Sequence, residues 1–159
     1  MSDKTYRAGA IGHTGAGNFG HQIHLAYQGL DNVEFVSIAD PDPEGRAKAA
    51  GESGATASYA DYHQMLAEED LDIVSVCTRP KFHAPLVIES AKRGVRGILS
   101  EKPMAENLGQ AREMVDVSQK NNVKLAIDHQ LRFNSPYVVA KELIADGVIG
   151  EIFRVHAVC

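Results

Sequence analysis

The sequence alternates short apolar runs with segments of helical periodicity, and this alternation constrains the fold more than any other feature. The predicted strands are Arg7 to Ile11, Val33 to Ala39, Asp72 to Cys77, Gly97 to Ser100 and Val123 to Ile127. A short strand is also expected near residue 56. A repeated strand–helix–strand order predicts an α/β fold, a doubly wound parallel sheet with helices on both faces.

Helix start signals lie between these runs. The expected N-termini are Asp42-Pro43-Glu44, Asp61 with Gln64, and Asn107 with Gln110. We also predict helices from a glycine-rich turn through residue 30, over 85–93, and from 135 to 147. The expected buried face of the first of these is Ile23, Ala26, Tyr27 and Leu30.

The glycine-rich turn follows the first predicted strand and consists of Gly15, Ala16, Gly17, Asn18, Phe19 and Gly20. A pyrophosphate needs main-chain N–H donors at close range, and a Cβ atom would block that approach. A turn of this form between a strand and a helix predicts a Rossmann dinucleotide-binding site. Gly12 immediately follows the predicted strand, so the first functional glycine is either Gly12 or Gly15.

Asp40 ends the second predicted strand, at the position where an acid accepts hydrogen bonds from ribose hydroxyls and repels a 2′-phosphate. Arg46, the next basic residue, is expected inside the following helix rather than beside Asp40. These features favour NAD over NADP as the cofactor. An aspartate that merely begins a turn is the alternative interpretation.

Glu101, Lys102 and Pro103 follow a late predicted strand. When hydride leaves a carbinol carbon the hydroxyl proton must leave too, and an ammonium group stabilises the alkoxide-like oxygen and relays that proton. We assign this catalytic role to Lys102 and place Glu101, which we expect to pair with Lys102, in the cofactor-binding set. The Lys102–Pro103 bond is a candidate for the cis form. An isolated Glu-Lys-Pro is otherwise typical of a surface turn.

With these residues, the chain resembles the Gfo/Idh/MocA oxidoreductases, the family of glucose–fructose oxidoreductase and inositol dehydrogenase. The resemblance covers nearly the whole chain, through Ile11 to Gly20, Ala39-Asp40-Pro41, Tyr59, Asp61, Leu66, Asp72 to Val76, Thr78, His83, Gly94, Glu101-Lys102-Pro103, Arg132-Phe133 and Gly147 to Gly150. It implies NAD-dependent hydride transfer with a sugar or polyol substrate, Lys102 as the catalytic-site lysine and Asp40 as the ribose ligand. It also implies that Thr78 and His83 belong to the loop beside the nicotinamide.

Two features depart from the family pattern. Thr78-Arg79-Pro80 stands where the family usually has Thr-Pro-Asn, and Arg79 either faces an anionic substrate or is solvated. The family's second domain, which supplies the substrate pocket, is missing from the 159 residues. We therefore predict a Rossmann domain over 1–128, and over 129–159 a linker helix and the start of a truncated C-terminal domain. In this interpretation 152–158 is the first strand of a second α+β domain, and the chain is part of a longer enzyme.

Composition argues against several other classes. The formal net charge is −5 without clusters of Lys or Arg, so we expect neither nucleic acid nor a membrane as a partner. Two cysteines make no disulfide framework and no apolar run is long enough to cross a bilayer, so a cytoplasmic protein is expected. His13, His21 and His24 lie close in sequence but lack further ligands, so we predict no metal site.

Two functions are compatible with these observations. The first is the cofactor half of an oxidoreductase that acts on a sugar, polyol or related hydroxyl compound. The second is a non-catalytic nucleotide-binding module that serves as a sensor or assembly subunit. The intact Glu101-Lys102-Pro103 favours the first and the short chain favours the second. An exposed terminal strand would also allow the chain to self-associate as a homo-oligomer.

Overall fold

The chain is described here by a computed structural model that covers residues 4–15 and 23–156. It divides into two compact units, residues 1–128 and residues 129–159, and each is considered by itself. The expected contacts of Gly17, Asn18, Phe19 and Gly20 lie outside the described residues. So does His21.

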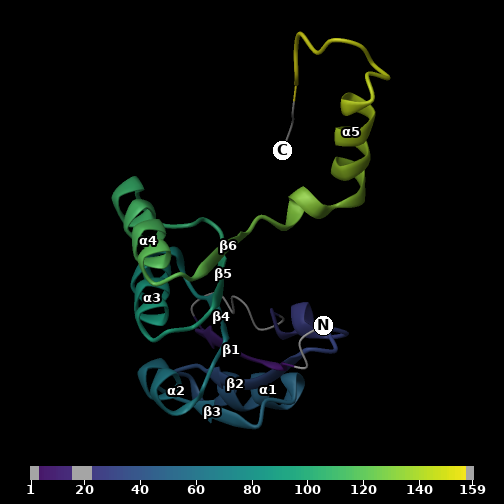
Figure 1. Cartoon of the computed structure of the whole chain (residues 1–159). Coiled ribbons are helices and arrows are strands. Elements are labelled where there is room, and N and C mark those ends of the chain that lie inside the picture. Colours follow the sequence, from purple (N-terminus) through teal and green to yellow (C-terminus); the bar gives the residue numbers. More distant parts are fainter. Residues whose placement is uncertain (1–3, 16–22, 157–159) are drawn as a thin grey trace. The chain divides into compact units, whose positions relative to one another are not determined.

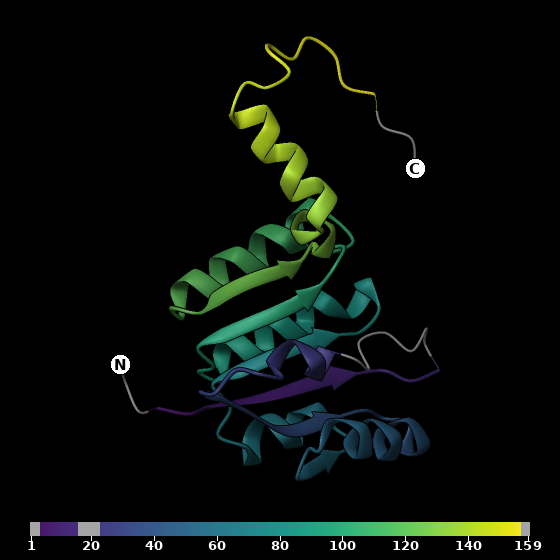
Figure 2. The same cartoon turned by 90° about the vertical axis from the view of Figure 1, so that its right-hand side faces the viewer.

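A six-stranded sheet, parallel throughout, forms the first unit. Its strands are β1 (Tyr6–Gly12), β2 (Val33–Ala39), β3 (Ala57–Tyr59), β4 (Ile73–Cys77), β5 (Gly97–Glu101) and β6 (Lys124–Asp128). The order across the sheet is β3-β2-β1-β4-β5-β6, and the strands all point the same way in Figure 2. The predicted doubly wound α/β fold is confirmed.

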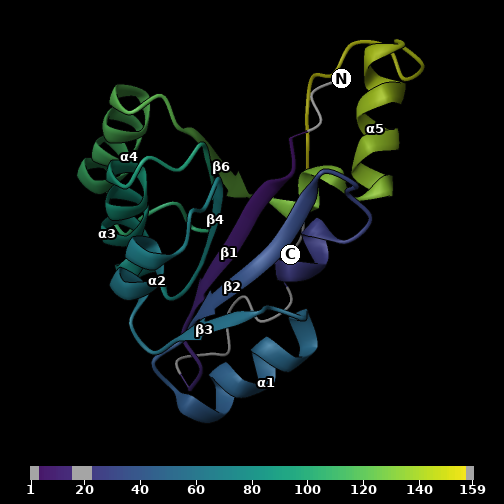
Figure 3. The same cartoon turned by 60° about the horizontal axis from the view of Figure 1, so that its bottom comes forward.

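Helices cover both faces of this sheet. They are the 3₁₀ helix η1 (Ile23–Tyr27) and the α-helices α1 (Pro43–Ser53), α2 (Tyr62–Glu68), α3 (Pro80–Lys92) and α4 (Leu108–Lys120). α2, α3 and α4 lie on one face, while η1 and α1 lie on the other (Figures 1 and 3). The core between the sheet and the first group contains Val36, Met65, Val74, Val76, Val87 and Met114.

The predicted caps start three of these helices. Asp42 accepts from the main-chain N–H of Gly45 at 2.6 Å, Asp61 from that of His63 at 2.8 Å, and Asn107 from that of Gln110 at 3.0 Å. Each bond satisfies a donor that the first turn of a helix leaves without an intrahelical partner.

The helix predicted through residue 30 is wrong in its described part, which is the short 3₁₀ helix η1. With three residues per turn, residues 24 and 27 share a face. His24 is buried and Tyr27 stacks on Phe35, whereas Ala26 and Leu30, expected inside, are exposed. The Tyr27 hydroxyl also shares a hydrogen bond with the Ser75 hydroxyl, with 2.5 Å between the two oxygens.

α3 begins at Pro80, five residues before the predicted start at Pro85. Proline is favoured at the first position of a helix, and both prolines fit that rule in the sequence. Pro80 occupies the first position, and Pro85 is accommodated inside the helix. The earlier start brings Phe82 and His83 into the first turns of α3, next to the carboxyl end of β4.

The second unit contains the 3₁₀ helix η2 (Gln130–Phe133) and α5 (Ser135–Ala145). Neither helix buries a residue. The predicted terminal strand is wrong for residues 152–156, which have no regular structure and expose Phe153 and Val155. A strand needs a neighbour to receive its main-chain hydrogen bonds, and the described part of this unit offers none. Within the described residues, no helix is both long and apolar enough to cross a membrane.

Candidate functional site

The direction of the winding reverses between β1 and β4 in the centre of the sheet. Gly12, the last residue of β1, lies opposite Cys77, the last residue of β4. In sheets of this kind ligands bind beyond the carboxyl ends of the strands at this switch point. The residues that follow β1, β2, β4 and β5 therefore converge on one edge, and they include Asp40, Thr78 and Lys102.

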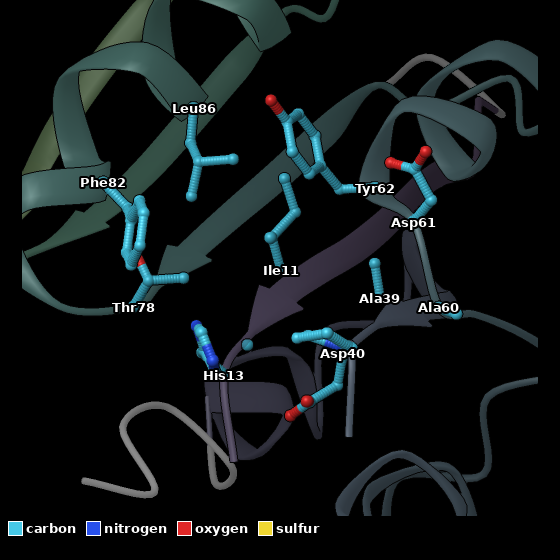
Figure 4. A pocket seen from close by; sticks show the side chains of 12 residues that line it. Ile11, His13, Ala39, Asp40, Ala60, Asp61, Tyr62, Thr78, Phe82 and Leu86 are labelled. Atoms are coloured by element: carbon cyan, nitrogen blue, oxygen red, sulfur yellow. The ribbon is translucent and has the colours of Figure 1, made fainter. Parts of the chain in front are cut away.

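A cavity of about 260 Å³ opens at this edge. Thr78, Phe82 and Leu86 approach it from one side and Asp61 and Tyr62 from the other, with Ile11 and Asp40 between them (Figure 4). Most of these side chains present carbon to the cavity. An apolar wall with a few polar groups at its rim is typical of a site for a flat organic ring.

Asp40 is fully buried at the end of β2. Its Oδ2 accepts from the N–H of Thr14 at 2.8 Å and from the Thr14 hydroxyl at 2.7 Å, while its Oδ1 accepts from the N–H of Asp42 at 2.9 Å. The carboxylate therefore joins the chain that leaves β1 to the start of α1.

The expectation that Arg46 lies away from Asp40 is wrong. Arg46 lies in α1, but its Nη1 donates to the main-chain carbonyl of Asp40 at 2.6 Å. The side chain is long enough to reach back over the first turn of the helix, which spacing along the sequence does not reveal. The cation therefore lies beside the end of β2.

Gly12 and Gly15 occupy different positions. Gly12 belongs to β1, whereas Gly15 lies in the turn that follows and has a φ of +75°. Glycine adopts that left-handed conformation readily and other residues rarely do. Gly15 is thus the first glycine that the turn itself requires.

His83 is fully buried in α3 and does not line the cavity. Its Nδ1 lies 2.7 Å from the carbonyl oxygen of Pro103, and its Nε2 lies 2.8 Å from the carbonyl oxygen of Thr78. Both ring nitrogens are thereby engaged by main-chain groups. The ring links the loop after β4 to the loop after β5, and Thr78 itself lines the cavity.

The Lys102–Pro103 peptide bond is cis, as the sequence suggested. The expected ion pair between Glu101 and Lys102 is not formed among the described residues. The Glu101 carboxylate accepts a hydrogen bond from the main-chain N–H of Lys102 at 3.1 Å instead. The exposed Lys102 ammonium is thus left facing solvent at the carboxyl edge of the sheet. That contact orients the peptide that carries Lys102.

The pKa values of two further side chains, Cys77 and Tyr62, are raised. Burial raises the pKa of the Cys77 thiol, and the nearby carboxylates of Glu101 and Asp128 raise it further. Burial also raises the pKa of Tyr62, together with Glu89 and Asp61. Both shifts favour the neutral forms of the Cys77 thiol and the Tyr62 phenol.

The structure adds residues that the sequence did not single out. Tyr62, Phe82 and Leu86 line the cavity, and Thr14 and Gly45 meet beside Asp40. A glycine in the first turn of α1 was the one available signal, because glycine is a poor helix former. Across residues 4–15 and 23–156, no cluster of three or more His, Cys, Asp or Glu side chains could hold a metal ion.

Comparison with known proteins identifies the family to which this site belongs. The profile of the Gfo/Idh/MocA oxidoreductases, described as an oxidoreductase family with an NAD-binding Rossmann fold, matches residues 10–129. The chain belongs to the Gfo/Idh/MocA oxidoreductase family. This membership confirms the resemblance seen in the sequence and makes the chain a member of an enzyme family with an NAD-binding domain.

Individual relatives agree with that assignment. The chain is 34% identical over 140 residues to D-apiose dehydrogenase of Paraburkholderia graminis, covering 87% of this chain and 37% of the relative. It is 31% identical over 140 residues to D-glucoside 3-dehydrogenase of Escherichia coli, covering 87% and 40%. The crystal structure of the WlbA dehydrogenase of Chromobacterium violaceum, in complex with NADH and UDP-GlcNAcA, superposes with a TM-score of 0.84 at 27% identity, covering 96% and 43%. The chain spans about two fifths of the length of these proteins.

Proposed function

We propose that this Gfo/Idh/MocA chain is the cofactor domain of an oxidoreductase that transfers a hydride between NAD and a carbon bearing a hydroxyl group. One observation carries the proposal. A buried carboxylate, Gly15 at the start of the glycine-rich sequence and a mostly apolar cavity lie at the switch point of the sheet, and Lys102 follows β5 at the same edge. The substrate class is a sugar, a polyol or a related compound, in line with the sugar dehydrogenases among the relatives.

The residues present suit NAD. The apolar walls of the cavity suit the adenine ring, Asp40 suits the adenosine ribose, and the glycine-rich sequence that begins at Gly15 is of the kind that admits a pyrophosphate. Thr78, which follows β4, and Glu101, the last residue of β5, contact the nicotinamide side in this proposal. When bound, NAD supplies the hydride acceptor or donor.

Lys102 performs the proton chemistry in this proposal. Its ammonium group donates a hydrogen bond to the substrate oxygen, stabilises negative charge on that oxygen, and relays the proton that departs. Glu101 holds the main-chain N–H of Lys102, and His83 holds the carbonyl of Pro103. These two contacts keep the lysine at the edge of the sheet where β4 and β5 end.

Calorimetry with NAD and NADP tests the binding step. We expect NAD to bind more tightly than NADP, because the buried Asp40 carboxylate repels a phosphate on the ribose, while Arg46 beside the Asp40 carbonyl reduces the size of that preference. Asp40→Ser should narrow that preference, whereas Asp116→Ser, at an exposed position of α4, should leave it unchanged. A folded chain that binds neither nucleotide would refute the proposal.

Substitution of the lysine tests the catalytic step. We propose that residues 129–159 form a linker helix and the start of a substrate domain, and that turnover requires the longer, cytoplasmic protein. In that protein Lys102→Met should abolish turnover and preserve NAD binding, and Lys92→Met, at the end of α3, serves as the matched control. Retained turnover in Lys102→Met would remove the lysine from the mechanism. Binding without hydride transfer to any hydroxyl substrate would identify a nucleotide-binding module instead.

A further inference from the structure

Thr14 is held between two residues that are distant in sequence. On one side its N–H and its hydroxyl donate to the same oxygen of Asp40, at 2.8 and 2.7 Å. On the other side it packs directly on Gly45. A Cβ atom added to Gly45 would lie 1.8 Å from Oγ1, 2.4 Å from Cβ and 2.5 Å from Cγ2 of Thr14.

Gly45 is a glycine because of this contact. It lies in the first turn of α1, where alanine would form a better helix and where φ is not in the left-handed region. Gly51 lies in the same helix, and an added Cβ there would meet nothing within 4 Å. The three atoms nearest to a Cβ added at Gly45 all belong to the Thr14 side chain. The steric requirement for glycine is therefore specific to the side chain of Thr14.

Thr14 lies immediately before Gly15, where the chain adopts a φ of +75° and the glycine turn begins. Its position therefore determines the direction in which the chain leaves β1. The position is anchored to a buried carboxylate, because Asp40 is also bonded to Asp42 through its side chain and to Arg46 through its carbonyl. The start of the turn, the end of β2 and the start of α1 are thus one assembly.

We infer that Thr14 is a positioning residue for the cofactor. The missing side chain of Gly45 leaves a notch on α1, and the Thr14 side chain occupies this notch. This inference rests on the proposed NAD site. The main-chain N–H groups of the turn must point at the pyrophosphate, and a hydrogen bond weakens steeply when its length or angle changes. A β-carbon at 45 would require a shift of about 1.2 Å, from 1.8 Å to the 3.0 Å below which such contacts essentially never occur.

Two alanine variants of α1 test the notch. Gly45→Ala should weaken NAD binding about tenfold or more, measured by calorimetry on the full chain, because the turn no longer starts in the right place. Gly51→Ala is the matched control and should bind NAD within about twofold of the unmodified chain. Both substitutions favour the helix, so a loss confined to Gly45→Ala does not arise from α1 itself.

Variants of Thr14 separate its hydroxyl from its bulk. Thr14→Ser keeps the donor and should retain affinity, whereas Thr14→Val keeps the shape, loses the donor and should bind several-fold less tightly. Thr14→Gly removes all three crowding atoms, so adding Gly45→Ala to that variant should cost little further affinity. An equal loss from Gly45→Ala in both backgrounds would overturn the inference.

Hydrogen exchange of the Thr14 amide provides a readout that does not require NAD. The Thr14 amide should be protected in the unmodified chain and in Gly51→Ala, and should exchange faster in Gly45→Ala. If the unmodified chain fails to bind NAD, the proposed function fails but this exchange pattern stands. If NAD binds normally to a folded Gly45→Ala and the Thr14 amide stays protected, the inference about Thr14 fails while the proposed function stands.

Discussion

Replacing His83 with leucine should destabilise the chain through two carbonyl groups rather than through lost volume. The ring is fully buried, and its nitrogens lie 2.7 and 2.8 Å from the carbonyl oxygens of Pro103 and Thr78. Leucine fills most of the same space and donates nothing. Each carbonyl group that accepts a hydrogen bond from the ring would then lack its donor.

The size of the loss follows from the number of donors. A buried polar group left without its partner costs about 1–3 kcal/mol. A neutral imidazole donates from one nitrogen and a doubly protonated imidazole from both, so we expect a decrease of about 2–4 kcal/mol in the free energy of unfolding. His83→Gln, which keeps one amide donor, should fall between leucine and the unmodified chain. Nitrogen NMR of the ring counts the donors directly.

Urea unfolding followed by circular dichroism at pH 7 measures this difference, with equal m-values required for the comparison. His63→Leu is the control, because the His63 side chain on α2 is 53% exposed and its replacement should change stability by no more than about 0.5 kcal/mol. A His83→Leu variant as stable as the His63→Leu variant would refute the reasoning. It would mean that the two carbonyls find other donors.

Three further predictions concern charge, a thiol and the cavity. Burial opposes ionisation of Asp72, but hydrogen bonds from Lys4 and from the Arg7 N–H outweigh it and lower its pKa. The stabilisation is therefore present above the ordinary carboxyl pKa and is lost as the pH falls through the lowered value. In urea titrations, Asp72→Asn should lower the free energy of unfolding by about 1 kcal/mol at pH 7 and by almost nothing at pH 2. Equal losses at both pH values would contradict this. Cys77 is buried and burial raises its pKa, so in a Cys159→Ser background it should react with a thiol reagent only after unfolding, and reaction in the native chain would contradict its burial. Ala60 is exposed at the rim of the cavity, so Ala60→Trp should fill the cavity and lower NAD affinity about tenfold without lowering the melting temperature. The control Ala67→Trp, on α2, should change neither the affinity nor the melting temperature. Unchanged affinity in Ala60→Trp would place the adenine ring elsewhere.

The fold was largely predictable because strands buried on both faces have a strong sequence signature. The prediction for β2 matches its observed bounds, and the caps at Asp42 and Asn107 start helices as expected. The failures come from tertiary choices. Two prolines competed for the first position of α3, and the terminal strand needed a partner that residues 129–156 do not supply.

The sequence predicted which residues of the candidate site follow strands, but not the side-chain contacts between them. Asp40 and Lys102 follow strands, and position in a parallel sheet is enough to bring them to one edge. The reach of Arg46 back to Asp40, and of His83 to Pro103, depends on side-chain direction in three dimensions. The contact between Thr14 and Gly45 joins residues 31 positions apart and has no local signature beyond a glycine in a helix.

The central position of β1 has a consequence for how the chain acquires its structure. β1 pairs with β2 on one side and with β4 on the other, so its second edge is covered only when residues 73–77 are available. A chain emerging from the ribosome can therefore assemble β1, β2 and β3 early, but it must carry the open edge of β1 until Cys77 has been made. Conditions that slow synthesis between β3 and β4 should lengthen the time during which that edge is exposed to other chains.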